Sequence, residues 1–300
     1  MGSSIGNLEF DSQTNNNSDC VPEKDRFKFV DDLSVLEIIN LLNIGLASHN
    51  FRQQIPNDIP THGQIIPSSN LKSQTYIEEI NRWTNNQQMI ISEKKTKAMV
   101  INFTHNYQFQ PRLTLNNQNI EVVDKIKILG TIIENSLSWN ENCMAIIKKV
   151  NARMQLLRKV WSFGSTKQEM VHLWKTFCLS VLDQSCVVWD SGLTAENRAD
   201  LERTQKTFTK LVLEEDYETY PKALQALQLE TLENRRKTLT LSFVKRSLSD
   251  GKFRYLFPLR RKPHIMKTRH PNKYKTTHAL TERFKNSPII TMQKLLNENP

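Results

Sequence analysis

The sequence predicts an α+β protein in which short antiparallel strands and one amphipathic helix precede an all-helical region. Two observations favour this class. Up to about residue 139, apolar and polar residues alternate over short runs separated by Asn, Gly and Pro, as in strands and turns. After residue 139, apolar residues recur every three or four positions, which is the period of a helix. We therefore expect four segments: 1–24, 25–139, 140–250 and 251–300.

The first two segments open with polar and turn-rich sequence. Residues 1–24 include the run TNNNS and have no apolar period, so we expect them to be disordered. Residues from Phe27 to about Ile38 fit two short strands joined at Asp31 and Asp32. In the alternative, Asp32 caps a helix that begins LSVLEIINLL. Residues 51–70 contain three prolines and a glycine and are predicted to form a long loop.

Four further elements are expected before residue 139. An amphipathic helix over about 71–88 would place its apolar residues on one side, namely Ile77, Ile80 and Trp83. The stretch KAMVINF alternates and predicts a strand, and Asn116 and Asn117 mark a hairpin. The stretch KIKILGTII predicts either a strand pair or a bend at Gly130.

Helical periods then follow one another to about residue 250. The first ends at Gly164 and has its apolar side at Ile146, Val150, Met154, Leu157 and Trp161. Ser165 with Gln168 resembles a capping box that opens a helix with Met170, Trp174, Phe177 and Val181 on its apolar side. We expect a third helix after Thr194 and a fourth after Pro221, with apolar positions at Leu201, Phe208, Leu211, Leu224, Leu227, Leu232 and Leu239.

The last segment, from Gly251, is basic. Twelve Lys and Arg residues stand against Glu282 and Glu298, and aromatic residues lie among them. These cations could contact phosphates while the aromatic rings stack on bases, and Arg260, Arg261 and Lys262 are candidates for the contacts. The alternative is a disordered cationic terminus without a defined ligand.

Composition restricts the possible functions. A net charge of +10 favours an anionic partner, and nucleic acid is the commonest, although a membrane surface or a merely basic protein would give the same sum. The four cysteines show no CxxC spacing, so a zinc site is not expected. No run is long and apolar enough to span a bilayer, and no signal peptide is recognisable. We expect an intracellular protein, either nuclear or cytoplasmic, without a membrane partner.

The adjacent aspartates Asp31 and Asp32 are the candidate catalytic group. Two neighbouring carboxylates repel each other unless they are solvated, used as a cap, or held by a cation such as Mg²⁺. At a hairpin tip, both could point toward a divalent metal ion. Two-metal phosphoryl transfer uses such ligands to bring nucleotide phosphates and a 3′-hydroxyl together.

Four blocks of sequence resemble the reverse transcriptases of non-LTR (LINE-like, jockey-like) retrotransposons. FVDD at 29–32 is similar to the aromatic-x-Asp-Asp signature of that family, and INRWTNNQQMIISEKKTKAMVINF is similar to its next block. KIKILGTIIENSLSW resembles the block that grips the primer end. CVVWDSGLTAENRADLERTQKTFTKLVL and LQLETLENRRKTL look like the helical thumb and its extension. The resemblance covers residues 26 to about 245.

This resemblance implies a partial palm followed by a thumb-like helical region, from a nucleotidyltransferase of a transposable element. Asp31 and Asp32 would be palm carboxylates, of which the first ligates Mg²⁺, next to Phe29 and Val30 at the substrate. The next assignments complete the site: Lys95 would face the phosphates of the incoming dNTP, and Leu129 and Gly130 would shape the primer site. The partners implied are an RNA template and a DNA primer.

The chain departs from the family pattern before Phe29. Such polymerases need a third carboxylate from an earlier palm strand and a glycine-containing substrate segment, and about 28 residues cannot hold both. We therefore expect a truncated enzyme without polymerase activity as an isolated chain. Two alternatives stay open: a non-enzymatic nucleic-acid-binding module, and a non-functional transposon relic. Arg235 and Arg236 would most simply give a basic helix face, with phosphate contact a second possibility.

Overall fold

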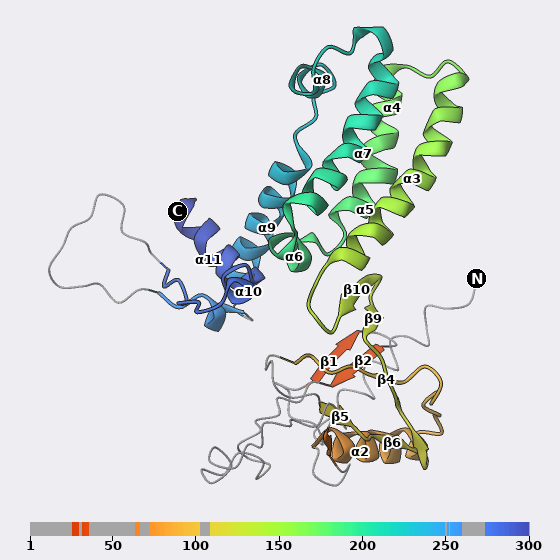
Figure 1. The fold of residues 1–300 in the computed structure, drawn as a ribbon, viewed down its shortest axis with the longest axis vertical. Coiled ribbons are helices and arrows are strands. Elements are labelled where there is room, and N and C mark those ends of the chain that lie inside the picture. Colours follow the sequence, from red (N-terminus) through yellow and green to blue (C-terminus); the bar gives the residue numbers. More distant parts are fainter. Residues whose placement is uncertain are drawn as a thin grey trace, which may run out of the picture. The chain divides into compact units, whose positions relative to one another are not determined.

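The computed structural model describes residues 26–29, 32–35, 64–66, 72–102, 109–249, 251, 253–259 and 274–299. The chain divides into two compact units, Met1–Ile126 and Lys127–Pro300. The protein is mixed helix and sheet, with many helices and few short strands, as predicted (Figure 1). Residues 127–139, which the sequence placed with the strand region, group with the helical unit. The predicted disordered segment 1–24 lies outside the described residues.

In the first unit, β1 (Arg26–Phe29) and β2 (Asp32–Val35) form an antiparallel pair. Phe29 lies opposite Asp32 in this pair. This confirms the predicted pair of strands. Because Asp32 to Val35 are extended, the alternative in which Asp32 caps a helix is excluded. Val30 and Asp31 themselves lie outside the described residues.

Two parallel strand pairs of the first unit were not predicted. β3 (Gln64–Ile66) pairs with β5 (Phe109–Pro111), so a strand forms within the predicted loop 51–70. β4 (Lys97–Ala98) pairs with β8 (Glu121–Val122), and this pair also has an ion pair between Lys97 and Glu121. The strand predicted over KAMVINF is therefore only two residues long in the described part of the chain.

The predicted helix and the Asn-Asn hairpin are confirmed. Helix α2 spans Lys72–Asn86, and β6 (Thr114–Leu115) pairs antiparallel with β7 (Gln118–Asn119). Asn116 and Asn117 have φ of 50° and 63°, as a two-residue hairpin turn requires. Gln74 of α2 ties the two elements together, because its side chain bonds both the N–H and the C=O of Thr114. The small core beside this hairpin comprises Leu113, Leu115 and Ile120, with Ile77, Ile91 and Ala98 packed against it.

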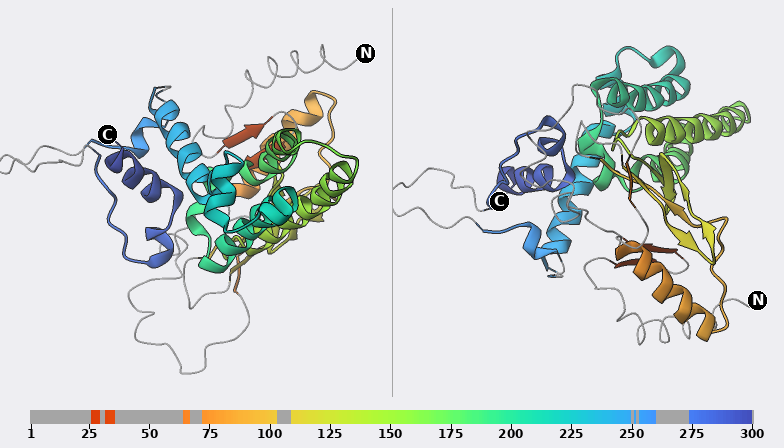
Figure 2. Two further views of the ribbon diagram at one scale, coloured as in Figure 1. Left: turned by 90° about the horizontal axis from the view of Figure 1, so that it is seen from above. Right: turned by 60° about the horizontal axis from the view of Figure 1, so that its bottom comes forward.

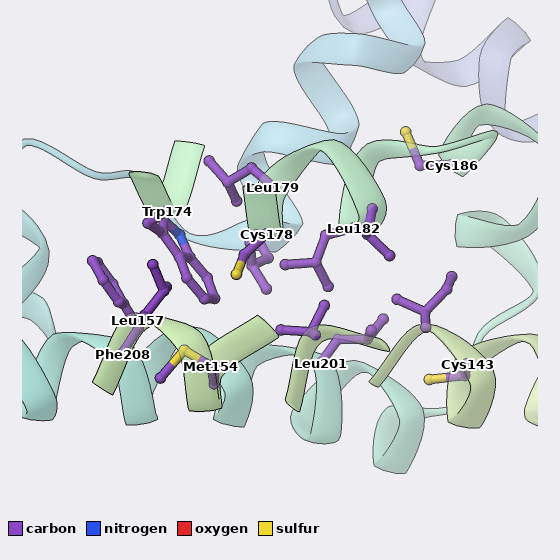
Figure 3. Close-up of a cluster of buried hydrophobic side chains, with 14 of the residues drawn as sticks. Cys143, Met154, Leu157, Trp174, Cys178, Leu179, Leu182, Cys186, Leu201 and Phe208 are labelled. Carbon is purple, nitrogen blue, oxygen red and sulfur yellow. The ribbon is translucent and has the colours of Figure 1, made fainter. Parts of the chain in front are cut away.

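In the second unit, β9 (Lys125–Ile128), which begins just before the unit boundary, pairs with β10 (Thr131–Glu134) and leads into α3 (Asn140–Ser162). The strand-pair alternative at Gly130 is thus confirmed. Helix α3 packs on α7 (Ala195–Leu213) (Figure 1). Of the residues that its period predicted, it buries Ile146, Val150, Met154 and Leu157, whereas Trp161 is only partly buried. The core between the helices includes the stacked rings of Trp174 and Phe208, whose centroids lie 4.5 Å apart (Figure 3).

The second helical stretch is interrupted twice. It comprises α4 (Lys167–Leu173), the π-helical segment η6 (Trp174–Leu179), α5 (Ser180–Asp183) and α6 (Cys186–Trp189). The capping box is formed by Thr166 and Glu169, one residue later than predicted. The wider turn of η6 shifts the helical register, so Cys178 is buried whereas Phe177, which was predicted on the apolar side, is 53% exposed.

The region after α7 also differs from the prediction. The single helix expected after Pro221 is two helices, α8 (Tyr220–Ala226) and α9 (Leu232–Ser249). They are separated at Gln228, whose φ of 51° cannot continue a helix. The carboxylate of Glu202 on α7 accepts hydrogen bonds from the N–H of Leu232 and so caps α9. The prediction of a strand-free region from about 140 to 250 holds for the described residues.

The C-terminal residues 274–299 are part of the helical unit. Helices α10 (Glu282–Lys285) and α11 (Pro288–Glu298) form the end of the basic segment. Helix α11 packs against α9 (Figure 2) and also contacts α6. A third core cluster joins α9 to this region and comprises Val244, Phe257, Met292 and Leu296. The described part of the tail is thus folded, contrary to the alternative of a disordered terminus. No helix among the described residues is long and apolar enough to cross a membrane.

Candidate functional site

The turn between β9 and β10 is the candidate site that the structure describes most fully. Leu129 and Gly130 occupy the two turn positions with φ of 49° and 87°. The side chain of Leu129 is 46% exposed. The Nε2 of Gln184 donates a hydrogen bond to the carbonyl oxygen of Leu129 over 3.0 Å. A Cβ added at Gly130 would lie 2.5 Å from that same nitrogen, so the amide of Gln184 would have to shift, and the φ of 87° at this position itself favours glycine.

Gln184 lies at the break between α5 and α6. The next residue, Ser185, has a left-handed φ of 53°, which ends α5 and starts α6 in a new direction. The indole N–H of the fully buried Trp189 donates to the carbonyl oxygen of Gln184 over 2.9 Å. The backbone carbonyl of Gln184 is therefore bound by Trp189, while the side-chain amide of Gln184 binds the hairpin turn.

Two arginines of α9 bind the helices on either side of this break. Arg235 donates to both oxygens of Asp183, at 2.8 to 3.1 Å, and this hydrogen bonding raises the pKa of the guanidinium. Arg236 donates through Nε to Asp190 over 2.6 Å, and its guanidinium lies over the ring of Trp189. These bonds fix α5 and α6 to α9 and thereby position Gln184.

Arg236 corrects one sequence prediction. Its side chain is buried, with the residue only 1% exposed, so it does not belong to a basic helix face that meets solvent. Arg235 is about one-third exposed but is committed to Asp183. A phosphate contact by Arg236 is incompatible with this placement. Asp183 accounts for Arg235, and Asp190 accounts for Nε of Arg236, whereas both Nη atoms of Arg236 are buried without a hydrogen-bond partner among the described residues.

Helix α3, which directly follows the hairpin, exposes a group of free cations. It has one acidic residue, Glu141, against five basic ones. Arg153 donates to the carbonyl of Phe177 and to Ser180 Oγ. The other four are exposed and have no acidic partner among the described residues: Lys148, Lys149, Arg158 and Lys159. This helix therefore offers positive charge that no carboxylate of the described chain neutralises.

Lys95 lies in the first unit, whereas Leu129 and Gly130 belong to the second. Its side chain is exposed, and its N–H donates to the carbonyl of Ser92 in a turn that leads into β4. Asn116 anchors this turn, because its side chain donates to Glu93 and accepts from Asn81 of α2. Lys95 thus lies on a supported turn and has no ion-pair partner among the residues that the structure describes.

For the remaining predicted site residues, the structure describes either the backbone alone or nothing. Phe29 and Asp32 lie opposite each other in the β1–β2 pair. Val30, Asp31, Arg260, Arg261 and Lys262 lie outside the described residues. Within the described ranges, no group of three His, Cys, Asp or Glu side chains could hold a metal ion.

Sequence reasoning missed Gln184, Asp183 and Asp190 as the residues that hold the turn. A signal was present, because two aspartates flank an apolar helical stretch and Arg235 and Arg236 lie together on a helix with apolar neighbours. Charges in such surroundings require partners when the helices pack.

Comparisons of this chain with family models, with curated proteins and with solved structures find no match.

Proposed function

We propose that this chain is the second half of the palm, with the thumb and its extension, of a non-LTR retrotransposon reverse transcriptase, and that it binds an RNA–DNA primer-template. The complete enzyme would add dNTPs by Mg²⁺-dependent phosphoryl transfer. In this proposal the isolated chain binds the primer-template but does not extend it. The assignment rests on the four sequence blocks, and one feature of the structure supports it.

That feature is the exposed Leu129–Gly130 turn, held by Gln184. A residue that contacts the end of a primer must be accessible and must keep its position against thermal motion. Leu129 is accessible, while the hydrogen bond from Gln184 and the close approach at Gly130 restrict the turn. The turn also leads directly into α3 with its free cations, which suits the phosphates of a bound duplex.

The test is binding of a labelled RNA–DNA primer-template to the purified chain across a salt series, with and without Mg²⁺. We expect Gln184→Ala to weaken binding about threefold to tenfold, because a net hydrogen bond of about 1 kcal/mol no longer holds the turn. Leu129→Ala should weaken binding to a similar degree. Gln225→Ala, at an exposed position of α8, is the matched control and should bind like wild type.

The double variant Asp31→Asn/Asp32→Asn separates binding from catalysis. Salt-dependent binding that ignores both Mg²⁺ and this variant fits the proposal for an isolated chain. Primer extension that is lost on substitution would show that a working site is completed, and the expectation of an inactive chain would then be wrong. Equal binding by wild type, Gln184→Ala and Leu129→Ala would remove the turn from the binding site.

A second candidate function is a nucleic-acid-binding module without any polymerase role. The excess of free cations on α3 favours it, because that charge does not depend on the aspartate pair. The two functions differ in sequence and structure preference. A module of this kind would bind a blunt duplex as tightly as a primer-template with a recessed 3′ end, whereas the polymerase fragment should prefer the recessed end.

A further inference from the structure

The π-helical segment η6 places an aromatic side chain where the helical period would not. With an α-helical register, Phe177 would continue the apolar side of Met170 and Trp174. In the structure Cys178 and Leu179 are buried instead, and Phe177 points away from the core with about half of its surface exposed. A large exposed aromatic side chain offers apolar surface that a partner molecule can bury.

Arg153 of α3 supports this arrangement. Its guanidinium donates to the carbonyl oxygen of Phe177 and, over 3.5 Å, to Ser180 Oγ. A π-helical turn disturbs the regular backbone ladder, and here a charged donor from the neighbouring helix satisfies the carbonyl of the displaced residue. The backbone position of Phe177 is thus fixed by α3.

The side of α3 next to Phe177 has a mixed basic and apolar character. Lys149, Leu156 and Lys159 are exposed and are spaced by seven and three residues, so they share one side of the helix. Arg153 lies between them at the edge that faces η6. We call these four residues together with Phe177 the α3–η6 face. Neither Lys149 nor Lys159 has an acidic partner among the described residues.

We propose that Phe177 is an additional contact residue for the RNA–DNA duplex, that Arg153 positions it, and that Lys149 and Lys159 contact the phosphates beside it. The proposal rests on the proposed function, which supplies the duplex as the partner. Charge complementarity selects this occupant, because α3 has five basic residues against one acidic residue. A row of cations about 15 Å long, the rise of ten helical residues, suits a nucleic-acid backbone.

The test compares variants of the full chain in binding a labelled RNA–DNA duplex over a salt series. Phe177→Ala should weaken binding about tenfold at every salt concentration, because it removes an apolar contact and no charge. Lys149→Gln/Lys159→Gln should instead lower the slope of log Kd against log salt by about two. Arg153→Gln should weaken binding to the same degree as Phe177→Ala. The slope of log Kd against log salt should fall by at most about one, the value expected for the loss of a single phosphate contact.

The matched control is Met144→Ala. Met144 is as exposed as Phe177 and lies on α3, but it is on the opposite side of the helix from Arg153, about 180° around the axis, and about 22 Å along the axis from Lys159. We expect it to bind like wild type, and circular dichroism and thermal melting should show that all variants keep the fold.

The outcomes separate this inference from the proposed function. If wild type binds and Phe177→Ala binds equally well, the inference is overturned while the proposed function stands. If wild type does not bind the duplex at any salt concentration, both fail, and a protein partner for the α3–η6 face becomes the better explanation of its exposed side chains.

Discussion

Burial raises the pKa of the thiols of Cys143, Cys178 and Cys186 to about 11. All three side chains lie in the helical core. Figure 3 shows Cys178 between Trp174 and Leu182. A thiol that stays protonated is a poor nucleophile and a poor metal ligand. These residues therefore act as small apolar side chains.

The raised thiol pKa predicts a loss of stability in alkali. Between pH 9 and 11 the unfolded chain releases thiol protons that the folded chain retains, so the free energy of unfolding falls as pH rises through this window. Urea unfolding at several pH values should show this fall. The variant Cys143→Ala/Cys178→Ala/Cys186→Ala should be less stable at neutral pH but should show a shallower fall. An identical fall in both proteins would contradict the assignment.

At the scale of the elements, regular periods were predictable and interruptions were not. Helix α3 follows one period from Ile146 to Trp161, and its end at Gly164 was read from the sequence. The register shift in η6 was not predictable. It is accompanied by a hydrogen bond from Arg153 of α3 to the carbonyl oxygen of Phe177, and no local sequence pattern reveals this contact. The break at Gln228 uses a positive φ at a residue other than glycine, so composition gave no warning.

The candidate site was predictable to a similar extent. A strand pair or bend at Gly130 was predicted because glycine interrupts an apolar run, and Leu129 was named only through the family resemblance. Gln184 lies more than 50 residues away in the chain, and only tertiary packing brings it to the turn. Arg235 and Arg236 were expected to form a basic helix face. The sequence of α9 does not reveal that Asp183 and Asp190, about 50 residues earlier in the chain, pack against these arginines.

The Asp190–Arg236 pair should be the more costly of two ion pairs to break. Asp190→Ala leaves a buried guanidinium without its partner and should lower the free energy of unfolding by about 3–5 kcal/mol. The exposed pair of Glu218 and Lys222 is the control, and Glu218→Ala should cost less than about 1 kcal/mol. Urea denaturation measures both, and similar losses would mean that the burial of Arg236 contributes nothing.

At the scale of the whole molecule, the C-terminal residues complete the helical unit. The amide of Gln293 on α11 binds the carbonyl of Leu256 and the N–H of Thr277. Asn297 bonds both the N–H and the carbonyl of Tyr274 in the same way. The amide of Gln293 is buried and that of Asn297 is partly buried, and because both amides have their donor and acceptor groups satisfied, they fix a single arrangement of the surrounding chain. The described part of the basic segment is therefore anchored to the helices.

Removal of α11 should destabilise the helical unit. A chain that ends at Asn286 loses three buried apolar side chains, Ile290, Met292 and Leu296, each worth about 1.5–3 kcal/mol. We expect a loss of at least about 4 kcal/mol in the free energy of unfolding and a matching fall in Tm. A chain that ends at Glu298 retains these contacts and should melt like the full protein. Equal melting of the two shortened chains would disprove this role for α11.

The position of α11 also has a consequence for synthesis. A ribosome releases the chain from its N-terminus onward, so α9 emerges well before the helix that covers Val244. Until residue 296 has left the exit tunnel, the apolar surface of α9 and Phe257 has no cover. The nascent chain thus passes through a stage in which this surface is open to chaperones and to aggregation, and this stage ends when α11 folds onto α9.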